Sequence, residues 1–285
     1  MNANAITTAV ALPKTAAGPG RLRWLAIDAW VLAKRNFSHI RQIPEKLFDV
    51  TLQPIMFVLL FAYVFGGVIA VPGGGDYHEY LIGGILVQTL VFGLMGPGTS
   101  IATDLGEGII DRFTSLPMSR PAYLIGHLTA EFCATLLAIT IMVISGLIVG
   151  WGISSSVLEA MAGFGLLMLL AITMIWVGTL IGVKVRSADA VQGIAFVTVF
   201  PLTFVANTFV PVSGLPDGLR QVAEYNPVSC WAAMTRTLFG NPTALPENAA
   251  WPLQHPVVAG LIWCLAILAI VVPITLRSFR RRTTG

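Results

Sequence analysis

Charged side chains are scarce in this sequence. Asp, Glu, Lys and Arg together make up 11% of its 285 residues, whereas 55% are hydrophobic and the mean hydropathy is +0.79. Soluble globular domains carry about 25% charged residues, so this composition excludes an ordinary soluble domain. It predicts an all-α protein that crosses a membrane several times, because an open strand cannot satisfy its backbone hydrogen bonds in lipid.

Cysteine is also rare, and so are the motifs of catalysis. The three cysteines are scattered and odd in number, which argues against a disulfide framework. None of the four lysines stands in a phosphate-binding Gly-Lys-Ser/Thr context, and Gly-x-Ser-x-Gly, His-Glu-x-x-His and Cys-x-x-Cys are missing. His78 and Glu79 are too few to predict a metal site. The sequence therefore predicts no enzyme and no cofactor or metal bound by this chain.

Acidic and basic residues are missing from most of the apolar segments as well. Proton-driven carriers use arrays of such residues inside the membrane, and their absence implies an energy source outside this chain. Residues 1–20 are rich in Ala and Thr, lack the apolar core of a signal peptide, and are predicted to form a disordered tail. The net charge of +3 needs no nucleic-acid partner to explain it.

Six apolar runs are present, each long enough for a membrane helix of about 20 residues. They are Thr51–Val71, Tyr80–Ser100, Ala122–Gly150, Val157–Val183, Ala190–Pro211 and Pro256–Leu276. Residues 50–276 are accordingly predicted to form a six-helix transmembrane domain. Gly93, Gly96, Pro97 and Gly98 predict a bend in the second helix, and Pro201 predicts a kink in the fifth.

The basic residues predict the orientation of these helices. Fifteen of the seventeen Lys and Arg residues fall before the first run, in the segments after the second and fourth runs, or after the sixth. Only Arg220 and Arg236 fall on the opposite side. Because cytoplasmic segments are enriched in Lys and Arg, both termini are predicted to be cytoplasmic. Residues 277–285 form a basic cytoplasmic tail, and residues 21–49 form an amphipathic helix at the lipid interface.

The cytoplasmic segment between the second and third runs has the pattern of a helix. Asp104 can serve as N-cap, answered three residues later by Glu107, and Pro117 ends the helix. One polar stripe and one apolar stripe recur at helical spacing within it. A loop that only reversed the chain would need about two to eight residues, so this amphipathic helix is predicted to be a docking surface. Lys184–Arg186 is a weaker second candidate.

Two polar residues within the apolar runs are candidates for transport. Glu131 is the one carboxylate that lies well inside a predicted span, and such residues are costly and often functional. A structural pairing with Arg120 or His127 is an equal alternative. Asn207 follows Pro201 and suits either a cavity lining or a hydrogen bond between helices. Between the fifth and sixth runs, residues 212–255 predict two short outer helices, one ending at Asn226-Pro227 and one beginning near Ser229.

These residues resemble the membrane subunits of type-2 ABC exporters, and most of all the daunorubicin/doxorubicin-resistance permeases. The resemblance rests on Thr103-Asp104 through Arg112-Phe113-x-x-Leu116-Pro117, followed by Pro121-Ala122 and a long helix. Supporting motifs are Ile43-Pro44 through Phe57, Asn207-Thr-Phe-Val, and Asn226-Pro-Val-Ser with Arg236 beyond it. It covers nearly the whole chain after the N-terminal tail, with residues 104–117 as its specific part.

The resemblance implies a permease in a bacterial cell membrane that pairs with a second copy or paralogue. It implies two separate ATPase subunits, which bind the ATP and Mg, and a coupling helix at residues 104–117 that docks into them. Carried over by position, Glu107, Gly108, Asp111, Arg112 and Phe113 would make that contact. ATP binding would then switch the cargo cavity from inward- to outward-facing.

The cargo leaves alternatives open. A lipophilic drug or a lipid is the first hypothesis. Export of a polysaccharide or glycolipid is the second, and a wide charged groove with an aromatic ladder would favour it; the sequence shows neither clearly. A stand-alone membrane carrier or enzyme is a third hypothesis, from another class.

Overall fold

The computed structural model describes three long stretches and several short pieces of the chain. The long stretches are residues 76–110, 120–245 and 248–284, and the short pieces are 52, 55–56, 58–61 and 63–64. All regular structure within these ranges is helical. The predicted N-terminal tail and interface helix, and most of the predicted first span, lie outside the described residues.

Four helical stretches in the described part are long and apolar enough to cross a bilayer. They are α3 (Tyr77–Phe92) with α4 (Met95–Gly106), α6 (Arg120–Val149), α7 (Val157–Lys184) and α12 (Pro256–Thr284). A fifth apolar helix, α8 (Ala188–Phe204), has 17 residues, near the shortest length that spans hydrocarbon. The prediction of several apolar membrane helices is thus confirmed for these segments.

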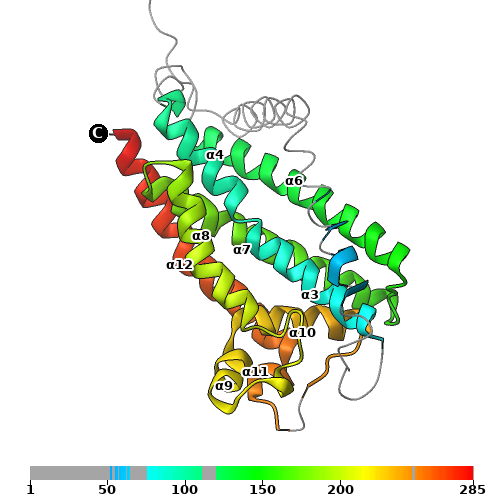
Figure 1. The fold of residues 1–285 in the computed structure, drawn as a ribbon. Coiled ribbons are helices and arrows are strands. Elements are labelled where there is room, and N and C mark those ends of the chain that lie inside the picture. The colour runs from blue at the N-terminus through cyan, green and yellow to red at the C-terminus, as the bar shows by residue number, and fades with distance from the viewer. Residues whose placement is uncertain are drawn as a thin grey trace, which may run out of the picture.

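The long helices lie side by side, and short elements cover one end of the bundle (Figure 1). At this "α10 end" are η1 (Val212–Gly214), α9 (Asp217–Tyr225), α10 (Pro227–Phe239) and α11 (Trp251–Gln254). The C-terminus lies at the opposite "C-terminal end", where α4 and α7 finish and α6 and α8 begin. α12 continues helically through the basic residues after Leu276.

Local sequence explains where several helices begin. Ser156 and Glu159 form a reciprocal capping box at the start of α7, and Ser187 caps α8. Asp76 caps α3 by accepting a hydrogen bond from the His78 backbone N–H at 3.0 Å. That backbone bond, together with the His78 ring, holds the pKa of the exposed Asp76 carboxyl below its usual value. The predicted bend in the second span is confirmed, since α3 ends before Gly93 and α4 starts at Met95.

α10 is inserted among the long helices. Asn226 stops α9, as predicted, and its side chain then caps α10. Ten of the thirteen α10 residues are buried, and the helix packs on α3, α7 and α12. Trp231 Nε1 donates to the Gly260 carbonyl at 3.1 Å, and a Cβ on Gly260 would lie 2.7 Å from Met234 Sδ. The second outer helix therefore forms part of the core.

Two predicted helix boundaries are wrong. Asp104 is not an N-cap: it lies inside α4, and Glu107 is the C-cap of that helix. The reason is Gly108, which has φ +65° and supplies the left-handed residue that commonly ends helices. The fifth span does not reach Pro211, because α8 stops at Phe204. The carbonyls of the following turn are used by Arg236 instead of by a continued helix.

Candidate functional site

The first part of the predicted coupling segment stands on a packed base at the C-terminal end. The Tyr123 hydroxyl of α6 donates to Asp104 Oδ2 of α4, and the Tyr123 ring stacks on Phe279 of α12 with centroids 6.1 Å apart. Ile101, Ile110, Tyr123, Leu124, Val183 and Phe279 form one buried apolar cluster. This cluster joins α4, α6, α7 and α12. Ile110, the last described residue in this part of the coupling segment, is therefore held in place by packing in this cluster.

Gly108 divides the predicted coupling helix. Glu107 and Gly108 form a turn after α4, and Ile109 and Ile110 are helical again. Glu107 is exposed, whereas Ile110 is 2% exposed. The remaining predicted contact residues, Asp111, Arg112, Phe113 and Pro117, lie outside the described residues. The structure thus places Asp104, Glu107 and Gly108 of this set at the end of α4.

α4 and α7 touch backbone to backbone beneath that segment. A Cβ on Gly178 would lie 2.0 Å from the Leu94 carbonyl oxygen, and one on Gly182 would lie 2.3 Å from the Gly98 carbonyl oxygen. Such distances are below any real contact, so only glycine fits at both positions. Close approach through small residues is the usual basis of helix packing in membranes. α4 and α7 are therefore packed in direct contact along this stretch.

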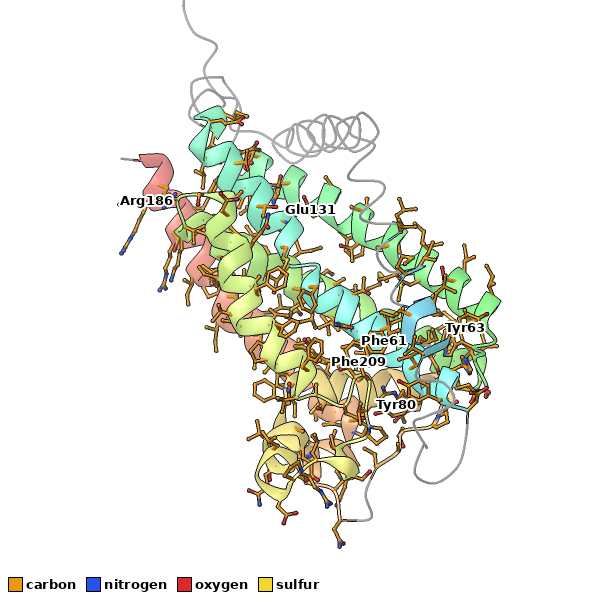
Figure 2. The ribbon with its side chains drawn as sticks, viewed as in Figure 1. Phe61, Tyr63, Tyr80, Glu131, Arg186 and Phe209 are labelled. Atoms are coloured by element: carbon orange, nitrogen blue, oxygen red, sulfur yellow. The ribbon has the colours of Figure 1, made fainter. Side chains whose placement is uncertain are left out.

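Glu131 lies on α6 and faces α4 (Figure 2). A Cβ on Gly96 would lie 3.2 Å from Glu131 Oε2, so the carboxylate sits against the α4 backbone. Its side chain is half-buried, and Figure 2 labels it between the two helices. His127, one turn earlier, is buried and stacks on Tyr123. The predicted acidic group is therefore brought to the helix that carries the coupling segment.

A buried polar cluster at the α10 end was missed by the sequence analysis. Arg236 is 0% exposed. Its Nε donates to the Tyr80 carbonyl at 2.7 Å, its Nη1 to the Asn207 carbonyl at 2.7 Å and its Nη2 to the Thr208 carbonyl at 2.8 Å. The guanidinium also lies 3.5 Å from the centre of the Tyr80 ring, a cation–π arrangement. The available signal was an arginine among apolar residues of a predicted helix.

Asn207, predicted as a cavity lining or a helix–helix contact, belongs to this cluster. Its side-chain oxygen accepts a hydrogen bond from the Tyr80 hydroxyl, and its backbone N–H donates to Ser229 Oγ at 2.9 Å. The residue is fully buried. The contacts support the helix–helix interpretation, because they tie the turn after α8 to α3 and α10.

Six phenylalanines form a chain of ring contacts along α8, here called the α8 aromatic row. Successive centroid distances are 6.3, 6.4, 4.2, 5.8 and 4.3 Å for Phe92, Phe196, Phe200, Phe204, Phe209 and Phe61 in that order. Figure 2 labels Phe61 and Phe209 where the row approaches Tyr80. Phe196, Phe200 and Phe204 are 53%, 44% and 51% exposed. Their spacing of four residues was the signal that the sequence analysis missed.

Comparison of the sequence with known proteins identifies a family and several relatives. The family model for the ABC-2 type transporter matches residues 28–239. The chain is 28% identical over 250 residues to the daunorubicin resistance ABC transporter permease protein DrrB1 of Streptomyces coeruleorubidus, covering 87% of this chain and 84% of that protein. It is 23% identical over 253 residues to the doxorubicin resistance ABC transporter permease protein DrrB of Mycobacterium tuberculosis, covering 85% and 86%.

The family match extends over most of the chain and includes the coupling segment, Glu131, Asn207 and Arg236. Both relatives are aligned over more than four fifths of their own length. The resemblance found in the sequence is therefore confirmed. The chain belongs to the ABC-2 type transporter family and is the membrane permease subunit of an ABC exporter.

Proposed function

We propose that this permease exports a lipophilic drug or lipid across a bacterial cell membrane, as one of two permease copies or paralogues driven by two separate ATPase subunits. The observation that carries the proposal is the family match over residues 28–239. ATP and Mg are bound by the ATPases, which is consistent with the lack of a phosphate-binding motif in this sequence. The permease then supplies the pathway and the surface on which the ATPases act.

In this proposal six helices span the membrane and the C-terminal end of the bundle faces the cytoplasm. The exposed Lys and Arg residues at that end support this orientation. The segment after Gly108, with Asp111, Arg112 and Phe113, docks into a groove of the ATPase. When the ATPases close on ATP, α4 is displaced, and α7 follows because the two backbones are in contact at Gly178 and Gly182.

The α8 aromatic row supports a lipophilic cargo. Phenylalanine rings offer an apolar stacking surface, and three of them are half-exposed along one face of α8. The two named relatives are, by their printed names, permeases of daunorubicin and doxorubicin resistance. A polysaccharide or glycolipid is the second candidate, and an aromatic row can also serve sugars. Phenylalanine provides no hydrogen-bonding group for sugar hydroxyls, so the row favours the lipophile.

The test is purification and reconstitution with the cognate ATPase. We expect the ATPase to copurify with the wild-type permease and to be lost from the double variant Asp111→Arg, Phe113→Ala. Asp217→Arg is the matched control, since it places the same charge on an exposed position at the α10 end. ATP-dependent uptake of a lipophilic dye into inverted vesicles should be seen with wild type and with Asp217→Arg, and should be lost in the double variant. Uptake in vesicles that hold the permease without an ATPase would overturn the proposal in favour of a stand-alone carrier.

A further inference from the structure

Six exposed basic residues lie where α7 and α12 finish. Five of them, Lys184, Arg186, Arg277, Arg281 and Arg282, are here called the inner basic cluster, and the sixth is Arg280. Arg186 is labelled at this end in Figure 2. Cations in the last turn of a helix interact favourably with its carbonyl end, but that effect requires one or two residues on each helix. The concentration of five at one place calls for an anionic partner.

The two basic segments are fixed relative to each other. Arg282 Nη2 donates to the Lys184 carbonyl oxygen at 3.3 Å, which joins the ends of α12 and α7 directly. Val183 and Phe279, one on each helix, are buried in the same apolar cluster. The helix ends that carry the cations are thus packed against each other, so the two basic segments form one surface.

The charge of the cluster is largely uncompensated in the described part of the chain. Asp189, three residues after Arg186, is the exposed carboxylate nearest in sequence. Asp104, at the same end, accepts a hydrogen bond from Tyr123 on α6, and Glu107 is exposed at the end of α4. Five cations beside these three carboxylates leave a positive surface. An anion with two or more negative oxygens would complement that surface.

The position of the cluster along α12 indicates which anion. Ile270 and Leu276 are 61% and 41% exposed on the same helix, and Arg277 follows directly. Exposed aliphatic side chains that give way to cations mark the depth at which hydrocarbon meets phosphate headgroups. An anion at this depth that also covers the aliphatic surface has acyl chains.

We propose that the inner basic cluster binds the phosphate headgroup of an anionic phospholipid, whose acyl chains cover the exposed aliphatic residues of α12. The assignment to the inner leaflet rests on the orientation in the proposed function. The binding itself does not, because a bilayer nanodisc offers both leaflets and the permease is measured without its ATPase.

The experiment counts lipids bound to the purified permease by native mass spectrometry after incorporation into nanodiscs of equal phosphatidylglycerol and phosphatidylcholine. The wild-type permease should retain phosphatidylglycerol in preference to phosphatidylcholine. The triple variant Lys184→Gln, Arg281→Gln, Arg282→Gln should lose that preference by about fivefold for each cation removed. Asp189→Asn should strengthen it, and Arg220→Gln, at the α10 end, should leave it unchanged.

Equal retention of the two lipids by wild type, or an unchanged preference in the triple variant together with no gain in Asp189→Asn, would overturn the proposal. Glycerol 1-phosphate, which has the headgroup without acyl chains, is the competitor. If it displaces the lipid at concentrations near that of the lipid, the cluster is a site for free phosphates. If the triple variant keeps its lipid and, in a separate copurification with the ATPase, loses the ATPase, the cluster is a second docking point for the ATPase, and the lipid assignment fails.

Discussion

Arg236 carries a positive charge into the bundle and makes no ion pair with a carboxylate in the described part of the chain. Three backbone carbonyls and the face of Tyr80 take the place of a counter-ion. A cation is well matched to that position, because α8 directs its carbonyl end toward the turn that holds Asn207 and Thr208. The residue thus fastens the end of α8 to α3 and α10.

Removing the Arg236 side chain should destabilise the permease strongly. Arg236→Ala leaves three buried carbonyls without their donor, and hydrogen bonds to charged groups are worth about 1.5–3 kcal/mol each. We expect a loss of at least about 3 kcal/mol in the free energy of unfolding, measured by denaturant titration in detergent. Arg220→Ala is the control: the partly exposed Arg220 forms one ion pair with Glu224, and the Glu224 carboxylate keeps its hydrogen bond from the Ala250 N–H, so this variant should lose less stability than Arg236→Ala. Equal losses in the two variants would refute the structural role of Arg236.

Gly108 and Gly106 offer a comparison at the coupling segment. A Cβ at either position meets nothing within 4 Å, but Gly108 has φ +65° and Gly106 is helical. Gly108→Ala should therefore cost about 1 kcal/mol of strain and weaken ATPase stimulation by cargo. Gly106→Ala should be neutral or slightly stabilising, since alanine is the better helix former by about 1 kcal/mol. ATPase activity of the reconstituted complex is the measurement, and a stronger defect in Gly106→Ala would contradict the observed end of α4.

At the scale of elements, the contact of α4 with α7 depends on glycine. Gly178→Ala would place a Cβ 2.0 Å from the Leu94 carbonyl oxygen, so the helices must separate, at about 1–3 kcal/mol for an overpacked site. Gly165→Ala changes the same helix at a position where a Cβ meets nothing within 4 Å. We expect Gly178→Ala to lower the unfolding temperature and to reduce transport per ATP hydrolysed, with Gly165→Ala near wild type.

If Gly178→Ala were as stable and as well coupled as Gly165→Ala, the backbone contact could not be the connection between α4 and α7. Transport and hydrolysis must be measured on the same vesicles, because a loss of stability alone would lower both in proportion. A lower ratio of the two is the signature of a mechanical defect.

The elements that the sequence predicted correctly are those set by local chemistry. The end of α9 at Asn226 follows from the Asn-Pro pair, and the break before α4 follows from Gly93. The predicted helix start at Asp104 was wrong. The pattern Asp-x-x-Glu is typical of a capping box at the start of a helix, but here the same pattern occurs at the end of α4. Only the conformation of Gly108 distinguishes the two cases, and composition does not report it.

Long-range contacts lay beyond the sequence for a different reason. Arg236 donates to a carbonyl 156 residues away in α3 and to another 29 residues away. Backbone carbonyls are present at every residue, so nothing in the sequence marks these as partners. The α8 aromatic row is intermediate: the spacing of Phe196, Phe200 and Phe204 predicts a stripe, but Phe92 and Phe61 join it only through packing.

For the molecule as a whole, the two ends of the bundle have opposite character. The C-terminal end collects exposed cations around the coupling segment, whereas the α10 end is closed by short helices whose one buried cation is held by carbonyls. Between them run α4 and α7 in direct contact and α8 with its aromatic face. A movement applied at the basic end can therefore reach the helices that border the proposed cargo path.

The orientation is testable with a pair of matched cysteines. Asp189 and Asp217 are exposed aspartates in the first turns of α8 and α9, at opposite ends of the bundle. In a Cys133→Ala background, where Cys230 and Cys264 are buried, a membrane-impermeant maleimide should label Asp217→Cys in intact cells. It should label Asp189→Cys only after permeabilisation, because the proposed orientation places that end, with its exposed cations, in the cytoplasm. Labelling of Asp189→Cys in intact cells would reverse the orientation and remove the coupling segment from the reach of any cytoplasmic ATPase.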